Sequence, residues 1–229
     1  MRLIRNILLL SLSFISFGTY AQKNLPTYDA KFLHFGISLG LNYTYFRVEH
    51  KADFLYNDTL FIVESSPKQG INMGIISDIR MGKYFNLRFI PTLSFAQRKV
   101  EYTFVNNKFH TKTIESTFAE LPLFIKYKSD RFKNMRVYVF GGGKYSIDMA
   151  SQARVQLEVN DEVKPRLYRA NWAYEYGLGF DFYYPIFKFS IEIKKTNGLN
   201  NVLLPENHIW SSQIDKLLSR AVLISMHFE

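Results

Sequence analysis

Between Trp172 and Phe182 the chain alternates strictly between large apolar side chains and small or charged ones. The large set is Trp172, Tyr174, Tyr176, Leu178, Phe180 and Phe182, and the other set is Asn171, Ala173, Glu175, Gly177, Gly179 and Asp181. A strand turns successive side chains to opposite faces, so one face of this segment is apolar and the other is narrow and polar. A strand of a soluble sandwich also alternates, but six large side chains without a polar interruption favour contact with hydrocarbon. The segment therefore predicts a strand between lipid and a polar lumen.

The same two-residue period recurs along the chain and predicts eight strands. They cover about residues 33–49, 70–81, 85–104, 114–128, 135–153, 172–182, 186–196 and 218–228. The connections after the first, third, fifth and seventh strands are long, whereas the other three are short. Bacterial outer-membrane barrels have an even number of strands, short periplasmic turns and long outer loops. The pattern therefore predicts an all-β fold, an eight-stranded antiparallel transmembrane β-barrel of the outer membrane with both termini in the periplasm.

Two parts of this pattern are irregular. Pro91 lies inside the third strand and cannot donate a hydrogen bond to a neighbouring strand, so we expect a β-bulge there. Residues 51–69 contain Ser65-Ser66-Pro67 and show no clear alternation, which predicts a polar loop after the first strand.

The first 21 residues have the pattern of a secretory signal peptide. Arg2 and Arg5 precede an apolar run over residues 7–17, and Thr19-Tyr20-Ala21 is a small-x-small site with cleavage between Ala21 and Gln22. An apolar run of this length is too short to span a bilayer as a helix, and no later segment has about 18 uncharged apolar residues. We therefore predict residues 1–21 as a signal peptide and 22–229 as one outer-membrane β-barrel domain.

Composition excludes several classes of protein. The chain has no cysteine, which excludes disulfides, thiol catalysis, a cysteine zinc site and a lipid-anchoring cysteine after the leader. Removal of the leader with its two arginines leaves 27 basic against 20 acidic residues, a net charge of +7. These charges are scattered and the protein is exported, so nucleic acid is not expected as a partner. Anionic outer-leaflet lipid or a partner protein fits the charge better.

The polar faces of the predicted strands carry as many acidic as basic residues. The inward set is Asp78, Arg80, Arg88, Glu120, Lys126, Lys144, Asp148, Glu175, Asp181, Lys188, Glu192 and Lys194. An eight-stranded barrel is too narrow for a water channel, and its side chains fill the interior. Because buried charges are costly unless they are paired, the balance predicts a lumen charge network with a structural role. A transport path or an acid–base site is the alternative.

No motif of established chemistry is complete. Gly141-Gly142-Gly143-Lys144 differs from a phosphate-binding loop because Tyr145 follows the lysine and the segment continues as a strand. The glycines fit bending or close packing of the barrel wall.

Some small outer-membrane barrels are lipid A acyltransferases or deacylases, with serine, histidine and an acid near the outer rim. The residues of these types near predicted loops are His50, His110, His208, Ser65, Ser116 and Ser211. They show no recognisable catalytic or metal-ligand spacing. We therefore expect no enzyme activity, no catalytic residue, no cofactor and no metal.

The last strand, residues 221–229, alternates up to a nearly terminal aromatic residue, Phe228, followed by Glu229. Terminal strands of this kind are the recognition signal for the barrel insertion machinery, so we expect that machinery as a transient partner.

Across the whole mature chain, the sequence resembles the PorT family of Bacteroidota outer-membrane β-barrel proteins. The matching tracts are Phe35-Gly36-Ile37-Ser38-Leu39-Gly40, residues 87–95, residues 120–127, Phe140-Gly141-Gly142-Gly143, Asn197-Gly198-Leu199-Asn200-Asn201 and the terminal Ser225-Met226-His227-Phe228-Glu229.

The resemblance implies an association with the type IX secretion system, which exports proteins with a C-terminal sorting domain and serves gliding motility in some Bacteroidota. The family has no established catalytic residues to transfer. The resemblance therefore implies an accessory or assembly factor whose partners are other secretion-system proteins. The alternative is a stand-alone structural or adhesion barrel.

Overall fold

The computed structural model describes residues 23–50, 60–104, 109–149, 167–204 and 214–229. The elements are η1 (Tyr28–Ala30), β1 (Leu33–His50), β2 (Leu60–Ser66), β3 (Lys68–Arg80), β4 (Phe85–Phe89), β5 (Thr92–Phe104), β6 (Phe109–Lys128), β7 (Met135–Asp148), β8 (Ala170–Tyr183), β9 (Lys188–Gly198) and β10 (Ile214–Phe228). Within these ranges no helix is long and apolar enough to cross a membrane. The predicted signal peptide and its cleavage site after Ala21 lie outside the described residues.

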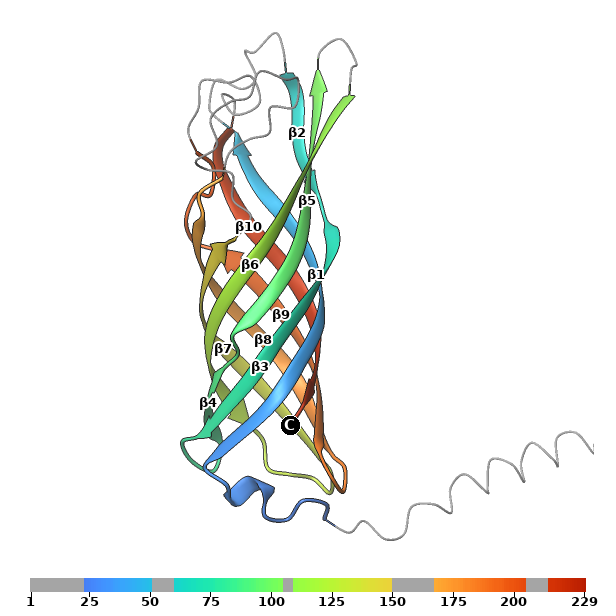
Figure 1. Cartoon of the computed structure of the whole chain (residues 1–229), viewed down its shortest axis with the longest axis vertical. Helices are drawn as coiled ribbons and strands as arrows, with labels where there is room; N and C mark the ends of the chain where they lie inside the picture. Colours follow the sequence, from blue (N-terminus) through green and yellow to red (C-terminus); the bar gives the residue numbers. More distant parts are fainter. Residues whose placement is uncertain (1–22, 51–59, 105–108, 150–166, 205–213) are drawn as a thin grey trace, which may run out of the picture.

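The strands close into one antiparallel ring (Figure 1). β3 follows β2 after a break at Pro67, and β5 follows β4 after Ile90 and Pro91. Each of these two pairs continues as one strand of the barrel, so the ten segments form eight strands of the wall. The ring closes where β1 pairs with both β3 and β10. The predicted eight-stranded antiparallel barrel is therefore confirmed.

Both described chain ends lie at the same end of the barrel (Figure 1). The short turns at 81–84, 129–134 and 184–187 are at that end as well, and the long connections are at the other. Short turns and termini mark the periplasmic side of an outer-membrane barrel. We call this end the inner mouth and the opposite end the outer mouth.

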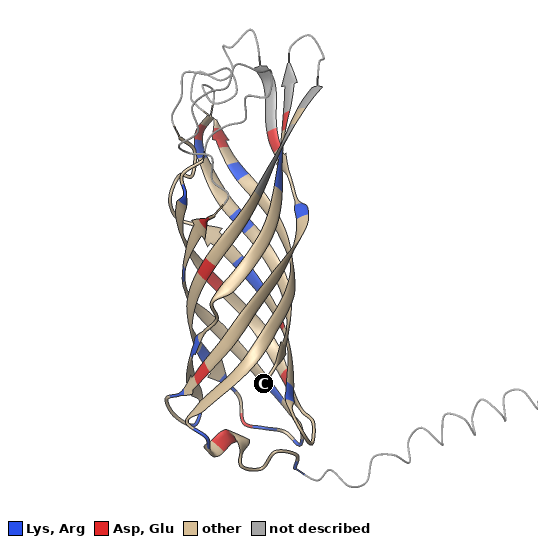
Figure 2. Ribbon diagram, in the orientation of Figure 1, with Lys and Arg blue, Asp and Glu red and all other residues tan. Residues whose placement is uncertain are grey.

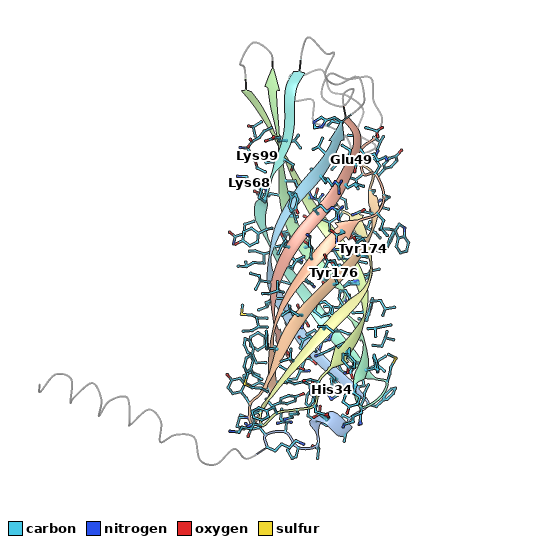
Figure 3. The ribbon with its side chains drawn as sticks, turned by 180° about the vertical axis from the view of Figure 1, so that it is seen from behind. His34, Glu49, Lys68, Lys99, Tyr174 and Tyr176 are labelled. Carbon is cyan, nitrogen blue, oxygen red and sulfur yellow. The ribbon has the colours of Figure 1, made fainter. Side chains whose placement is uncertain are left out.

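The two faces of the strands separate as the alternation predicts. Side chains project outward all around the wall (Figure 3), and Trp172 and Leu178 are 58% and 44% exposed, whereas Glu175 and Asp181 on the same strand are 2% and 1% exposed. The register aligns apolar outward side chains across neighbouring strands, so the wall has a continuous apolar band. This is the surface that hydrocarbon covers in a membrane barrel.

The expected bulge at Pro91 is wrong. The two residues between β4 and β5 are opposed by two residues of β3 and two of β6, so the register continues without an extra residue. The Pro91 carbonyl still accepts a hydrogen bond from the Ile75 amide at 3.1 Å. Proline lacks only the N–H group, so the wall loses a donor here while the alternation of faces is kept.

The expected polar loop over residues 51–69 is wrong in its second half. Residues 60–66 form β2, which pairs with β5 and extends with parts of β5 and β6 beyond the other strands at the outer mouth (Figure 1). The ladder between β1 and β3 ends at Thr44 and Lys68, and among the described residues no backbone ladder joins β1 to β2. Instead, the backbone amide of Phe46 donates a hydrogen bond of 2.9 Å to Ser65 Oγ, and this bond links β1 to β2.

Candidate functional site

The interior nearest the inner mouth is organised around the side chain of Arg88. Its guanidinium lies 2.7 Å from Asp78, 2.5 Å from Glu192 and 3.0 Å from Glu229, and all four side chains are at most 2% exposed. The partners come from β3, β9 and the end of the chain. One planar cation with five donors thus joins three acidic side chains that are distant in sequence.

Two further ion pairs extend this inner charge layer. Lys126 Nζ lies 3.1 Å from Asp181, which also accepts a hydrogen bond of 2.6 Å from the Ser190 hydroxyl. Lys188 Nζ lies 2.7 Å from Glu229. Basic and acidic residues are thus distributed over neighbouring strands, as the ribbon in Figure 2 shows. Such pairing offsets the large desolvation cost of each buried charge.

An apolar layer lies beside these charges in the lumen. It consists of Ile76, Ile90, Phe124, Tyr138 and Phe140, all of them buried. The Tyr138 hydroxyl donates to Glu192 at 2.6 Å, and Lys126 Nζ lies 3.4 Å from the centre of its ring. Gly179 is opposite Tyr138, and a Cβ atom there would collide with the ring. The small residues on the inward face of β8 therefore make room for aromatic side chains of β7.

A second charge layer lies farther toward the outer mouth. Lys144 Nζ is 3.0 Å from Glu120 and 2.8 Å from Glu175, and Glu175 also accepts a hydrogen bond from the Thr196 hydroxyl at 2.5 Å. A cavity of about 20 Å³ adjoins this layer, which is room for a single water molecule.

The outer end of the lumen is closed by aromatic and aliphatic side chains. The Arg98 guanidinium lies 4.9 Å from the ring centre of Phe46 and 4.6 Å from that of Phe118, and it donates to the Ser219 hydroxyl at 3.1 Å. The adjoining apolar cluster is Phe46, Val100, Leu167, Val202, Leu203, Ile214 and Leu217. A β-bridge between Leu167 and Leu203 brings two connecting segments over this end.

The structure places the twelve residues of the predicted lumen charge network as follows. Ten of them are buried: Asp78, Arg88, Lys126, Lys144, Asp148, Glu175, Asp181, Lys188, Glu192 and Lys194. Glu120 is partly exposed but pairs with Lys144. Arg80 is partly exposed at the inner turn, where its Nε donates to the Gly82 carbonyl at 3.3 Å. Among the described residues Arg80 has no ion pair, so it stands apart from the network.

Several further polar residues of the interior are absent from the predicted network. They are Arg98, Lys128, Arg136, His227 and Glu229. Arg98 and His227 occupy inward positions of the same two-residue period, so that signal was present. Glu229 follows His227 by two residues and so continues this inward series, although its pairing with Arg88 and Lys188 depends on the closed ring.

The segment before β1 covers part of the inner mouth. Asp29 accepts hydrogen bonds from Arg136 at 2.8 and 3.1 Å, and the Tyr28 hydroxyl donates to Glu229 Oε2 at 3.0 Å. The Asn24 side-chain amide donates to the Tyr183 carbonyl at 2.9 Å. This segment is therefore attached to three parts of the barrel and to its buried charge layer.

The charge of Asp29 sets the pH range of this attachment. Partial burial raises the pKa of its carboxyl, but hydrogen bonds from Arg136 and the nearby positive charges outweigh that effect and hold the pKa below its ordinary value. A lowered pKa contributes stability above the ordinary value of about 3.9, and the contribution is lost as the pH falls through the lowered pKa. The attachment is therefore complete at neutral pH.

Those serine and histidine candidates whose side chains the structure describes do not assemble into a catalytic site. Ser65 donates to the Lys99 carbonyl at 2.9 Å and accepts the bond from Phe46, so its hydroxyl has a structural use. His50 is exposed at the end of β1, and Ser116 is buried within β6. The side chains of His110, His208 and Ser211 lie outside the described residues. Within the described residues no group of three His, Asp or Glu side chains has the arrangement of a metal site.

The comparison with protein families agrees with this architecture. The model of the outer membrane protein beta-barrel domain matches residues 20–204, which is most of the chain. The chain belongs to the outer membrane protein beta-barrel domain family. It is therefore an outer-membrane protein. No curated protein matches the sequence.

Three solved outer-membrane proteins are similar to the chain at low identity and low TM-score. Neisserial surface protein A is 6% identical with a TM-score of 0.43, covering 86% of this chain and 98% of its own. OprG from Pseudomonas aeruginosa is 10% identical with a TM-score of 0.46, covering 86% and 95%. Ail of Yersinia pestis is 14% identical with a TM-score of 0.38, covering 86% and 98%. These values are too low to transfer a function.

The stacked layers predict a barrel that does not conduct ions. We expect the purified protein, reconstituted in a planar lipid bilayer at neutral pH, to give the baseline current of a protein-free bilayer, because charge and apolar layers fill the lumen. The measurement is single-channel recording, with protein heated to unfolding before addition as the control. Reproducible steps of conductance from the folded protein alone would contradict a closed lumen.

Proposed function

We propose that this protein acts by contact with other proteins, as a non-enzymatic accessory or assembly factor of the type IX secretion machinery. The filled lumen carries the first half of the proposal: most of its buried charges are paired, aromatic side chains lie between the charge layers, and the cavity of about 20 Å³ beside the second layer holds no more than a water molecule. The surfaces that remain for contact with another protein are the two mouths and the outside of the wall.

The inner mouth has features of a contact surface. Phe132 and Ile186, in two of its short turns, are 75% and 90% exposed. The segment around Asp29 is held close to the same mouth by its bonds to Arg136. An ordered rim with exposed large apolar side chains can bind a periplasmic partner, because burial of such side chains drives association.

The assignment to type IX secretion is supported by the resemblance to the PorT family. The tracts that carry it lie in the wall and at its ends, including residues 120–127 and Asn197-Gly198-Leu199-Asn200-Asn201. Asn200 and Asn201 have structural uses here: Asn200 Oδ1 accepts from the Trp172 amide at 2.8 Å and Asn201 Oδ1 from the Leu217 amide at 2.9 Å. They stabilise the outer end of the wall, which agrees with a role as a rigid contact protein.

Deletion of the gene tests the proposal directly. We expect proteins with the C-terminal sorting domain to decrease in the culture supernatant and to accumulate inside the cell, as measured by proteomics of both fractions. Normal export of these proteins in the clean deletion strain would refute the secretion role. A change in the mass of lipid A in that strain would instead indicate an enzyme at the rim.

Complementation with variants identifies the contact surface. Phe132→Asp with Ile186→Asp is expected to restore a folded barrel without restoring export. Leu199→Asp is the control, since Leu199 is an apolar side chain, 64% exposed, that directly follows the last residue of β9. Heat-modifiable gel mobility verifies folding of each variant. Full export with the inner-mouth variant would place the contact elsewhere.

A stand-alone adhesion barrel is the second candidate. The observation that favours it is the extension of β2, β5 and β6 beyond the outer mouth, which presents strands away from the membrane (Figure 1). In that case the deletion strain exports its cargo normally and loses binding of whole cells to surfaces.

A further inference from the structure

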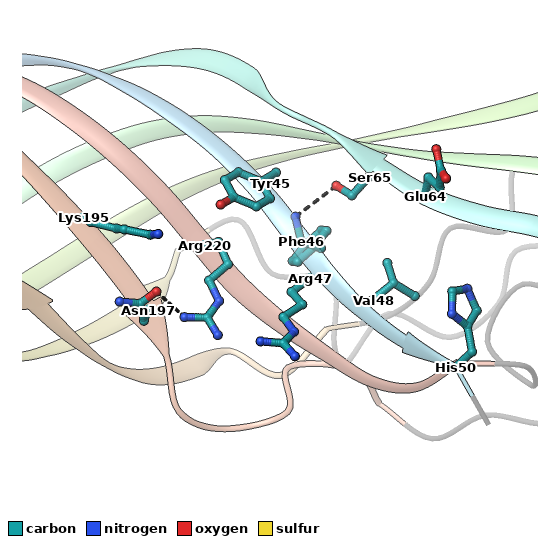
Figure 4. A pocket seen from close by; sticks show the side chains of 10 residues that line it. All are labelled: Tyr45, Phe46, Arg47, Val48, His50, Glu64, Ser65, Lys195, Asn197 and Arg220. Atoms are coloured by element: carbon teal, nitrogen blue, oxygen red, sulfur yellow. Dashed lines mark hydrogen bonds between the residues drawn. The ribbon is translucent and has the colours of Figure 1, made fainter. Parts of the chain in front are cut away.

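Three basic side chains gather on the outer surface of neighbouring strands near the outer mouth. They are Arg47 of β1, Arg220 of β10 and Lys195 of β9, and Figure 4 shows them on adjacent ribbons. The register fixes their spacing: Arg220 is opposite Tyr45 and Asn197, and Lys195 is opposite Val222. Arg220 is therefore the diagonal neighbour of both Arg47 and Lys195, a relation that puts its strand position about 7–8 Å from each of theirs, whereas Arg47 and Lys195 lie on either side of β10.

The group lies directly beyond the apolar band. One cross-strand row consists of Leu41, Ile224, Ile193 and Leu178, and the next toward the outer mouth consists of Tyr43, Val222, Lys195 and Tyr176. The row after that is Tyr45, Arg220, Asn197 and Tyr174. Tyrosine next to basic residues is typical of the level of lipid headgroups. The positive charges thus begin where hydrocarbon ends, in the outer leaflet.

Positive charge is in excess here. Among the described residues, Lys195 has no ion pair, and Arg220 donates only to the neutral side chain of Asn197. Arg47 Nε lies 3.5 Å from Glu49, which is also 3.9 Å from Lys216. The cationic cluster, defined as Arg47, Lys195 and Arg220, therefore has donors left for an anion.

A surface cavity of about 590 Å³ adjoins the cluster. Its lining includes all three cations, the tyrosine Tyr45 and one carboxylate, Glu64 of β2. It lies where β1 parts from β2, so it is a consequence of the missing ladder between them. The volume is within the range of small-molecule sites, and its lining has a net positive charge.

We propose that the cationic cluster binds the phosphate groups of a diphosphorylated glycolipid of the outer leaflet, of the lipid A type. Guanidinium groups bind phosphate through paired hydrogen bonds, and the lysine adds a point charge. The acyl chains of the same molecule lie along Leu41, Ile224 and Ile193, directly below the cations. A soluble anion would use the charges but not this apolar surface. The site thus holds one lipid against a defined face of the barrel, independently of any role in secretion.

The test uses the full-length mature protein in nanodiscs or mild detergent. The triple variant Arg47→Gln, Lys195→Gln, Arg220→Gln is compared with Lys68→Gln, Lys83→Gln, Lys99→Gln, which removes the same charge from basic side chains outside the cluster. Figure 3 shows Lys68 and Lys99 near the outer mouth, away from Glu49. Native mass spectrometry measures retention of diphosphorylated lipid A, and heat-modifiable mobility verifies that each variant is folded.

We expect the cluster variant to bind on the order of a hundredfold more weakly, since each of three basic residues near an anionic surface contributes roughly a factor of five. The control variant should bind like the wild type, and dephosphorylated lipid A should bind the wild type as weakly as the diphosphorylated lipid binds the cluster variant. Equal retention by both variants, or by both lipids, would overturn the proposal. Displacement of the lipid by millimolar inorganic phosphate would also overturn it, in favour of a soluble anion.

Discussion

Replacement of Arg88 by alanine is expected to destabilise the barrel by about 3–5 kcal/mol, the usual effect of removing one partner from a buried ionic group. The guanidinium is 2% exposed and is the common partner of Asp78, Glu192 and Glu229. Without it, Asp78 and Glu192 lose their closest cation, whereas Glu229 keeps Lys188 at 2.7 Å; Glu192 is left with the imidazole of His227 at 3.4 Å. The measurement is the free energy of unfolding in urea, followed by tryptophan fluorescence and by heat-modifiable gel mobility.

Arg80→Ala is the matched control for this experiment. Arg80 is the other arginine of the predicted lumen charge network, but it is partly exposed at the inner turn. Among the described residues, its side chain donates a hydrogen bond to the Gly82 carbonyl and has no ion pair. Its removal should change the free energy of unfolding by less than about 1 kcal/mol, like other exposed positions. Equal losses from both variants would show that Arg88 does not hold the inner charge layer together.

Replacement of Gly142 by valine is expected to prevent most of the protein from folding into the membrane. Gly142 lies opposite Phe124 on β6, and a Cβ atom at this position would overlap the Leu123 carbonyl oxygen, which belongs to the backbone of the neighbouring strand. A backbone in a closed ring cannot move aside without breaking hydrogen bonds to both neighbours. Overpacking typically costs about 1–3 kcal/mol, and a clash with the backbone belongs at the upper end or beyond. The fraction of heat-modifiable protein after refolding into lipid measures the effect.

Gly143→Val is the control for this substitution. Gly143 is the next residue of the same strand, it faces lipid, and a Cβ atom there would meet nothing within 4 Å. We expect it to refold like the wild type, because valine is favourable on a lipid-facing strand position. Efficient refolding of the Gly142 variant would mean that the close approach of β6 and β7 is not required.

The contrast between these neighbours shows how far the sequence could be interpreted. The tract of Gly141 to Gly143 indicated close packing of the wall, but the two-residue period does not distinguish which glycine is needed. Close approach depends on the neighbouring strand, and only the register of β6 against β7 puts the Leu123 carbonyl over Gly142.

The prediction of β2 failed for a related reason. Its residues include Glu64, Ser65, Ser66 and the following Pro67, and they lie beyond the apolar band. Residues 60–63 are all apolar and residues 64–66 are all polar, so β2 lacks the alternation that marks a membrane strand; outside hydrocarbon its two faces need not differ. Hydrogen bonding to β5 defines this strand, and that pairing is a tertiary contact.

The sequence by itself determined the class, location and faces of this protein. Strict alternation around Trp172 to Phe182 is enough for a membrane barrel, because a strand that separates lipid from a lumen must present two chemically different faces. Only the tertiary structure decided which charges meet. Arg88 joins residues from β3, β9 and the chain end, and the register brings Arg220 of the wall beside both Arg47 and Lys195. The reason is physical: pairing across a lumen depends on closure of the ring, and no local pattern in the chain encodes those distances.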